Sequence, residues 1–287
     1  MKNYLSLIKF SHTIFALPFA LIGFFIALKE LEKPFDWLIL GLILLCMVFA
    51  RSAAMAFNRY IDRDIDSKNP RTAQREIPAG VIKPSYALAF VILNSLFFVL
   101  TTWFINPLCF YLSPVALLVI LGYSYSKRFT WLCHFILGLG LALAPIGAYL
   151  AAGGNFDAIP LYYSFAVLFW VSGFDIIYAL QDRDFDMSLQ LKSIPVKLGK
   201  ERALWLSSFL HICCGLLIAL AAYSLFTQYD IFKWLTISGT VVFIALLIYQ
   251  HTIVKANDLS RVNIAFFTTN GFASLLLGVA IILDFWL

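Results

Sequence analysis

Charged residues are scarce in this chain. They make up 13% of its 287 residues, whereas hydrophobic residues make up 62% and aromatic residues 17%. So few charges are not enough to cover the surface of one or two water-soluble domains of this length. The mean hydropathy of +0.87 is also far above the value of a soluble domain. The composition therefore excludes a water-soluble fold and indicates an integral membrane protein.

Several other patterns are missing. The five cysteines show no Cys-x-x-Cys or Cys/His spacing, so we expect neither a structural zinc site nor a disulfide frame. The ten-residue segments of alternating hydrophobicity that mark an outer-membrane β-barrel do not occur. The first apolar run continues to Leu28 without a small-residue cleavage motif, which predicts a retained span and no cleaved signal.

Apolar runs divide the chain into candidate spans, each close to the ~20 residues that a bilayer core requires. Turn residues such as Asn106-Pro107 and Gly153-Gly154-Asn155 separate them. We therefore expect an all-α integral membrane protein with one transmembrane domain over residues 1–287. Its nine predicted helices lie near residues 12–28, 37–57, 86–105, 107–122, 131–151, 161–180, 203–226, 232–250 and 262–286.

The net charge of +5 comes from 21 Lys and Arg against 16 Asp and Glu, and in a membrane protein such an excess reports topology. In the nine-span arrangement, 17 basic residues fall on the side of the N-terminus and 3 on the other side, with Arg51 inside a span. The N-terminus and the long loops 58–85 and 181–202 are therefore predicted to face the cytoplasm, in a bacterial inner membrane. We expect no nucleic-acid partner.

The two long loops resemble each other. The sequence Asp-Arg-Asp-Ile-Asp begins at Asp62, and Asp-Arg-Asp-Phe-Asp begins at Asp182, 120 residues later. Each copy is followed by an Ile-Pro pair and then by a glycine. This repeat predicts two related helical halves, each with an acidic cluster at the cytoplasmic end of its second helix, and one additional helix.

Seven of the sixteen acids belong to these clusters or to the helix before the second one: Asp62, Asp64, Asp66, Asp175, Asp182, Asp184 and Asp186. In a helix, Asp62 shares a face with Asp66, and Asp182 shares a face with Asp186. Like charges so placed repel unless a cation bridges them, and oxygen ligands in this number suit magnesium bound to substrate phosphates. The pattern therefore predicts a magnesium-diphosphate site.

The alternative interpretation is a solvated loop in which Arg63 and Arg183 neutralise the acids. Two copies at matching positions, together with Asp175 inside an apolar run where an ion is costly, favour the metal site. Nearby cations would stabilise the charge of a leaving diphosphate. We expect Arg71, Lys127 and Lys192 to do so, with Arg75 and Arg128 as further candidates.

Further aromatic and basic residues lie near the cytoplasmic ends of the predicted spans. Tyr123, Tyr125 and Tyr178 are placed to shield a carbocation by cation–π attraction. His12, near the cytoplasmic end of the first span, is a candidate for contact with an aromatic acceptor. Arg51 is expected to point into the helix bundle, with no role assigned.

The motifs together resemble those of the UbiA superfamily of intramembrane aromatic prenyltransferases. The resemblance covers nearly the whole chain. Its motifs are Asn58-xxx-Asp62-xxx-Asp66, the segment Arg71-Thr-Ala-Gln-Arg75-Glu-Ile-Pro78-Ala-Gly80, Asp182-xxx-Asp186, and Lys192-Ser-Ile-Pro-Val-Lys-Leu-Gly199. The first motif of the family usually has Asp after its Asn. Arg59 stands at that position here, so this carboxylate is missing.

The resemblance implies a nine-helix bundle with a cytoplasm-facing polar cavity and a lateral opening for a polyprenyl tail. It implies two Mg²⁺ ions that bind the prenyl diphosphate, held by Asn58, Asp62 and Asp66 and by Asp175, Asp182 and Asp186. Loss of diphosphate would leave an allylic cation for attack by an aromatic ring carbon. The residues that match family positions around the diphosphate and the cation are Arg71, Tyr123, Lys127 and Lys192.

Three assignments of function stay open. The segment from Ile8 to Pro18 looks most like that of members acting on 4-hydroxybenzoate in quinone biosynthesis. Prenylation of a dihydroxynaphthoate in menaquinone biosynthesis is the alternative. An ion or metabolite transporter would also use repeated halves and intramembrane acids, but its site would lie near the bilayer midplane rather than at one face.

Overall fold

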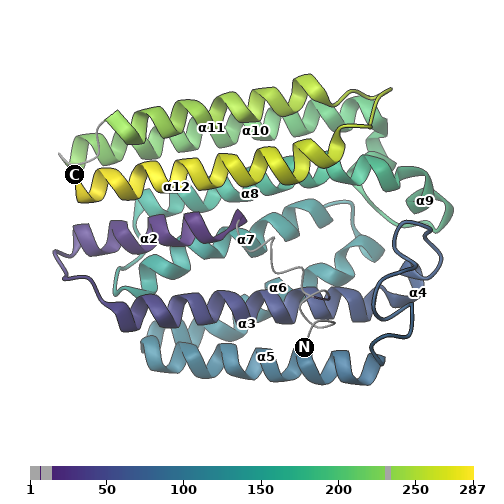
Figure 1. Cartoon of the computed structure of the whole chain (residues 1–287), viewed down its shortest axis with the longest axis horizontal. Coiled ribbons are helices and arrows are strands. Elements are labelled where there is room, and N and C mark those ends of the chain that lie inside the picture. The colour runs from purple at the N-terminus through teal and green to yellow at the C-terminus, as the bar shows by residue number, and fades with distance from the viewer. Residues whose placement is uncertain (1–6, 8–14, 230–233) are drawn as a thin grey trace. The chain divides into compact units, whose positions relative to one another are not determined.

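The computed structural model describes residues 7, 15–229 and 234–287. Within these ranges every regular element is a helix, apart from one isolated bridge between Lys255 and Asp258 (Figure 1). Eight of the helical stretches are long and apolar enough to cross a bilayer. The prediction of an all-α, multi-pass membrane protein is therefore confirmed.

The elements follow the predicted apolar runs with some differences at their ends. They are α2 (Leu17–Glu30), α3 (Trp37–Ile61), α4 (Arg63–Asp66), α5 (Pro84–Ile105), α6 (Pro107–Phe129), α7 (Cys133–Ala151), α8 (Ala158–Ala179), η2 (Leu180–Asp182), α9 (Arg183–Ser188), α10 (Ile194–Gln228), α11 (Trp234–Ile253), the π-helix η3 (Ile264–Thr269) and α12 (Asn270–Trp286).

The described part of the first predicted span is α2, whose 14 residues are fewer than a bilayer needs. Because residues 12–14 lie outside the described residues, the count of nine spans stays a prediction. Helix α6 continues to Phe129, past its predicted end at residue 122. Helix α10 begins at Ile194, ahead of its predicted start at 203, and contains a non-helical residue, Gly199, with φ 80°.

Capping side chains and prolines explain where several helices begin. Asp36 accepts hydrogen bonds from the backbone N–H groups of Leu38 and Ile39 at 2.9 and 3.1 Å, which caps α3. Asp157 caps α8 in the same way. Pro84 and Pro107 occupy the first positions of α5 and α6, where a missing N–H costs nothing.

Contacts within the chain define two compact units, and the two acidic copies fall in different units. The first unit comprises residues 1–13 and 36–126, and in it α3 packs alongside α5 (Figure 1). Small buried side chains such as Ala53 and Ala87 let these two helices approach closely, as is common in membranes. The rings of Phe49 and Phe97, with centroids 5.3 Å apart, extend the contact.

The second unit comprises residues 14–35 and 127–287, with α8 at its centre. Helix α8 packs against α7 and α10, α2 packs against α7 and α12, and α11 packs against α12 (Figure 1). Trp170 of α8 is fully buried, with ring centroids 5.1–5.8 Å from Phe19, Phe174 and Phe243. These aromatic contacts form the centre of the unit.

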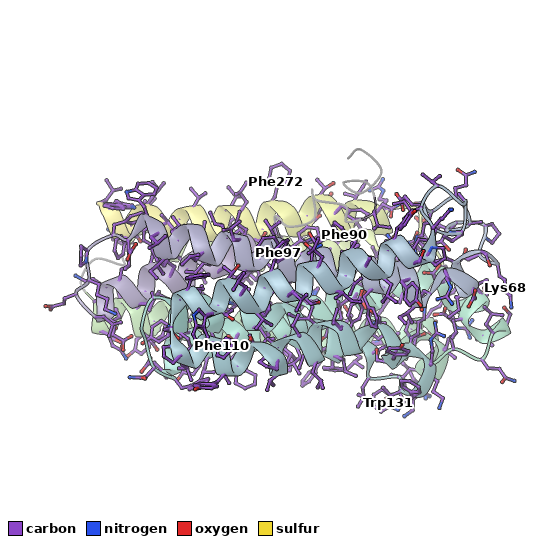
Figure 2. All side chains as sticks on the ribbon, turned by 90° about the horizontal axis from the view of Figure 1, so that it is seen from below. Lys68, Phe90, Phe97, Phe110, Trp131 and Phe272 are labelled. Carbon is purple, nitrogen blue, oxygen red and sulfur yellow. The ribbon has the colours of Figure 1, made fainter. Side chains whose placement is uncertain are left out.

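Large apolar side chains also cover outward faces of the helices, as expected for surfaces that contact lipid. Phe97 on α5 is 40% exposed and Phe272 on α12 is 57% exposed (Figure 2). In water such a surface would cause aggregation. In a bilayer it is the ordinary lipid-facing surface of the protein.

A buried asparagine ties three helices of the second unit together. The amide oxygen of Asn270 accepts hydrogen bonds from Trp170 Nε1 at 2.8 Å and Gln250 Nε2 at 2.6 Å. Its Nδ2 donates to the carbonyl oxygens of Ala265 and Phe266 at 3.1 and 3.0 Å. Both carbonyls belong to η3, so the side chain adds hydrogen bonds to the backbone of the π-turn.

Helices α7 and α8 approach so closely that only glycine fits at one point of contact. A Cβ atom on Gly138 would lie 2.5 Å from the carbonyl oxygen of Leu168 on α8. That oxygen is part of a helix backbone, so it has no room to move away. On the same helix, a Cβ atom on Gly147 would meet no atom within 4 Å.

The contrast between these glycines is testable. We expect Gly138→Ala to lower the stability of the detergent-solubilised protein by about 1–3 kcal/mol, because it overpacks the contact between α7 and α8. Gly147→Ala should leave stability unchanged or raise it by up to ~1 kcal/mol, because alanine is the better helix former. Thermal unfolding of the two variants measures this difference, and equal effects would contradict the close approach at residue 138.

Candidate active site

Both acidic copies fold around the same interruption of a helix. Asp62 ends α3 and precedes α4, with φ −89° and ψ 4°. Asp182 ends η2 and precedes α9, with φ −98° and ψ 1°. These angles lie in the sparsely allowed bridge region that active-site residues often occupy. The sequence repeat is therefore also a structural repeat.

The interruption leaves the predicted helical faces in place. The backbone N–H of Asp66 donates to the carbonyl oxygen of Asp62 at 2.7 Å, so these two acids keep helical spacing. The side chains of Asp66 and Asp186 are 7% and 0% exposed. The side chains of Asp64 and Asp184 are each 82% exposed. In each copy the last acid thus points inward and the middle acid points outward.

In the first copy, each of two acids contacts a specific partner. Asn58 Nδ2 donates to Asp62 Oδ2 at 3.0 Å. Arg75 Nη1 donates to both carboxylate oxygens of Asp66, at 2.7 and 2.8 Å. Arg63, by contrast, lies 3.9 Å from the exposed Asp64. Neutralisation by Arg63 therefore applies to the outward acid, whereas the buried acid is neutralised from the following loop.

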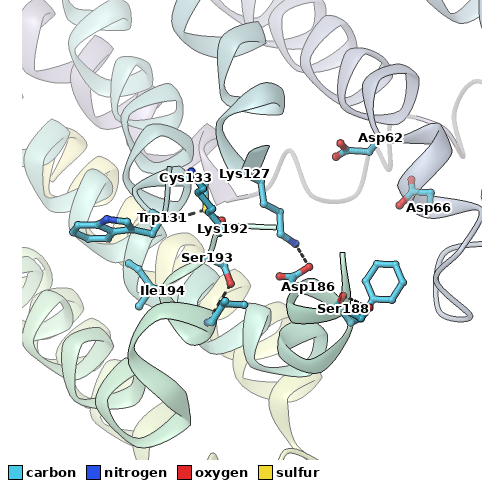
Figure 3. Close-up of polar contacts among 12 residues, drawn as sticks. Asp62, Asp66, Lys127, Trp131, Cys133, Asp186, Ser188, Lys192, Ser193 and Ile194 are labelled. Atoms are coloured by element: carbon cyan, nitrogen blue, oxygen red, sulfur yellow. Dashed lines mark hydrogen bonds and ion pairs between the residues drawn. The ribbon is translucent and has the colours of Figure 1, made fainter. Parts of the chain in front are cut away.

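In the second copy, too, the buried acid and the exposed acid have different cationic partners. Lys127 Nζ lies 2.7 Å from Oδ1 of the fully buried Asp186 (Figure 3). Asp182 interacts electrostatically with both of these residues. Arg183 pairs instead with the exposed Asp184, at 3.0 Å. Lys127 is therefore the cation that pairs with the buried acid of this copy.

Lys192 takes a different position from the one expected. Its Nζ donates to the carbonyl oxygen of Phe129 at 3.0 Å, and its backbone N–H donates to the carbonyl oxygen of Lys127 at 2.8 Å. Its carbonyl oxygen accepts a contact from Cys133 Sγ at 3.6 Å (Figure 3). Lys192 thus fastens the second loop to the end of α6, and its side chain is exposed.

Asp175 has a partner that the sequence did not reveal. His134 Nδ1 lies 2.7 Å from Asp175 Oδ2. The backbone N–H of Ile194 contacts the other ring nitrogen, His134 Nε2, at 3.3 Å. His134 therefore links Asp175 to the start of α10. It lies 41 residues from Asp175 in the sequence, which hid the pair.

The other predicted residues have different contacts within their own units. Arg71 is exposed, with its backbone N–H bound to Asn69 Oδ1 at 3.0 Å. Tyr123, on α6, interacts electrostatically with Arg51 on α3. The ring of Tyr178, one turn before Asp182, stacks at 4.2 Å on Phe266 of η3. His12 lies outside the described residues.

The acids fit a magnesium ion only with help from a ligand. Among the described residues, no three Asp, Glu, His or Cys side chains gather closely enough to form a metal site by themselves. Each copy instead offers two carboxylates, at Asp62 and Asp66 or at Asp182 and Asp186. One or two carboxylates completed by phosphate oxygens are the usual protein ligands of Mg²⁺. This donor set therefore suits a metal that arrives with a phosphorylated substrate.

Comparison with known proteins agrees with this geometry. A model of the UbiA prenyltransferase family matches residues 16–276. Over 238 residues the chain is 30% identical to the 4-hydroxybenzoate octaprenyltransferase of Aliivibrio salmonicida, covering 82% of this chain and 80% of that protein. The chain therefore belongs to the UbiA prenyltransferase family. It is a prenyltransferase, and the resemblance inferred from its motifs is confirmed.

Solved structures show the same fold. A UbiA homologue from Aeropyrum pernix K1, solved in its apo form, is 31% identical with a TM-score of 0.84, covering 95% of this chain and 98% of that one. A UbiA homologue from Archaeoglobus fulgidus, solved with GPP and Mg²⁺, is 20% identical with a TM-score of 0.74, covering 99% and 100%. The UbiA-type fold expected from the sequence is thereby confirmed.

The burial of the Lys127–Asp186 pair leads to a prediction about stability. Lys127→Met leaves Asp186 buried without its cation, so we expect a loss of about 3–5 kcal/mol in the free energy of unfolding without divalent cations. The matched control is Arg183→Met, which removes the cation of the exposed pair with Asp184 and should cost less than about 1 kcal/mol. Denaturant titration in detergent with EDTA compares them, and similar losses would show that burial does not distinguish the pairs.

Proposed function

We propose that this prenyltransferase moves a polyprenyl group from a prenyl diphosphate to a ring carbon of 4-hydroxybenzoate, with Mg²⁺ and with release of diphosphate, in quinone biosynthesis. The observation that carries the proposal is the inward acid of each copy. Asp66 and Asp186 are buried beside Arg75 and Lys127, where carboxylates and cations together suit a metal-diphosphate. The name of the Aliivibrio relative supports this acceptor.

In this proposal each acidic copy holds one magnesium ion. The ligands expected from the sequence are Asn58, Asp62 and Asp66 in the first unit and Asp175, Asp182 and Asp186 in the second. The bound metal would offset negative charge on the departing diphosphate. The Archaeoglobus homologue with GPP and Mg²⁺ supports this choice of metal and substrate.

The other site residues act on the substrate itself. Arg71 and Lys127 supply positive charge for the leaving diphosphate. Lys192 holds the second loop against α6 with its ammonium bound to Phe129, and it would reach phosphate oxygens by exchanging that contact. The rings of Tyr123 and Tyr178 offer π faces to an allylic cation. The stack of Tyr178 on Phe266 fixes the orientation of one of these rings.

The position of the acids favours the enzyme over a transporter. Asp62 follows the last residue of α3, and Asp182 closes the 3₁₀ turn that follows α8. Transporter sites are typically formed near the bilayer midplane by helices broken within the membrane. These acids instead follow the ends of spans, where a soluble diphosphate has access. We propose that this end faces the cytoplasm, in a bacterial inner membrane, as the basic residues predict.

The acceptor is tested directly by a prenyl-transfer assay. Purified protein is given Mg²⁺, geranyl diphosphate or longer donors, and either 4-hydroxybenzoate or a dihydroxynaphthoate. We expect a prenylated product with 4-hydroxybenzoate that disappears when Mg²⁺ is removed with EDTA. Product with the naphthoate alone would assign the enzyme to menaquinone biosynthesis, and no product from folded protein with any donor would contradict the proposed reaction.

The roles of the acids are tested by matched substitutions within each copy. Asp66→Asn and Asp186→Asn should lower kcat/KM by more than about a hundredfold, because each removes a metal ligand. Asp64→Asn and Asp184→Asn should retain activity, because these side chains are 82% exposed and point outward. Initial rates with membrane insertion as a control measure this. Loss of activity in the outward variants alone would overturn the assignment of faces.

A further inference from the structure

Arg59 is a buried cation that the proposed site has not yet used. It lies in the last turn of α3, directly after Asn58, and is 4% exposed. Its Nε is buried and has no hydrogen-bond partner among the described residues. A buried donor without a partner costs free energy, so native structures rarely keep one without a reason. A ligand with an oxygen acceptor would complete this hydrogen bond.

The charges around Arg59 come from several elements of the first unit. It interacts electrostatically with Asp66 and Glu76 as acids, with Arg75 as a base, and with the Tyr123 hydroxyl. Asp66 is already bound through both oxygens by Arg75 at 2.7 and 2.8 Å. The two acids and two arginines balance in charge. The charge of Arg59 is therefore balanced, and what its Nε lacks is a hydrogen-bond acceptor.

This balance changes if Asp66 coordinates a metal. A divalent cation on Asp66 would add two positive charges to a cluster that is otherwise neutral. It would also compete with Arg75 for the same two carboxylate oxygens. Arg59 and Arg75 would then stand beside a positive centre that attracts an anion with several oxygen acceptors. A diphosphate has that chemistry, and guanidinium groups bind phosphate oxygens in pairs.

We propose that Arg59 binds the diphosphate of the prenyl donor directly. The inference rests on the proposed function, because it requires a metal-diphosphate beside Asp66. It assigns a binding role to a residue that is cationic where the resemblance leads one to expect a carboxylate. In this chain a guanidinium contact to phosphate takes the place of one metal-ligand contact.

Arg63, four residues later, is the matched control. Its Nη1 donates to the carbonyl oxygen of Tyr60 at 2.6 Å, and its guanidinium lies 4.7 Å from the centre of the Tyr60 ring. It also faces the exposed Asp64. Arg63 thus has protein partners for its charge. It should take no part in diphosphate binding, although it is close to Arg59 in the sequence.

The test measures binding and stability in the full-length purified protein. Inorganic diphosphate is titrated with Mg²⁺ by calorimetry into the wild type, Arg59→Gln, Arg59→Lys and Arg63→Gln. We expect Arg59→Gln to weaken diphosphate binding by about ten- to a hundredfold, the range for a lost hydrogen bond to a charged group. Arg59→Lys should lose less, because it keeps the charge. Arg63→Gln should bind like the wild type.

Two further readouts separate binding from a structural role. Arg59→Gln should still fold, with a melting temperature somewhat below that of the wild type, because it leaves Asp66 and Glu76 with one arginine between them. The KM for the aromatic acceptor should stay constant. Unchanged diphosphate affinity, failure of Arg59→Gln to fold, or a rise in the acceptor KM alone would each overturn the inference. If the wild type itself binds no diphosphate with Mg²⁺, the proposed function fails, which is distinct from a failure confined to the Arg59 variants.

Discussion

A carboxylate at the end of a membrane-spanning helix needs a partner, because an unpaired charge there loses its hydration without compensation. Three acids of the candidate site obey that constraint in different ways. Asp66 is held by Arg75, Asp186 by Lys127 and Asp175 by His134. The loop after α4 places Arg75, the end of α6 places Lys127, and the contact between α7 and α8 places His134. The arrangement of the site therefore follows in part from the need to compensate buried carboxylates.

The proposed function gives these pairs a second role, in which each acid would exchange its cation for a metal. An acid held by a cation already has a positive partner, which a magnesium ion would replace. In the proposed site, a metal that took the carboxylate would leave the displaced arginine or lysine beside a positive centre, where an anionic substrate would be its partner. The ion pair and the proposed metal-phosphate complex would then be two arrangements of the same charges. The outward acids, Asp64 and Asp184, lie outside this exchange because their arginines and water already satisfy them.

Local patterns in the sequence predicted more of this molecule than distant contacts did. The apolar runs predicted most spans, and the spacing within each Asp-Arg-Asp repeat predicted which acids face inward. The pair of His134 with Asp175 was not predictable, because it depends on how α7 packs against α8 across 41 residues. The ammonium of Lys192 likewise binds Phe129, a residue 63 positions away, rather than an acid. Helical spacing relates neighbours in sequence and carries no information about such tertiary partners.

The π-helix η3 interrupts regular α-helical geometry at the start of the last span. A π-turn accommodates one residue more than an α-turn, so the helix before it is rotated by about 100° relative to a continuous α-helix. That rotation accompanies the stack of Phe266 on Tyr178, while Asn270 hydrogen-bonds two of the carbonyls in the turn. Removal of one residue would restore regular backbone bonding and turn the ring elsewhere. The π-turn is a less favourable backbone geometry than a regular α-helix, and it accompanies the contact of Phe266 with Tyr178, one turn before Asp182.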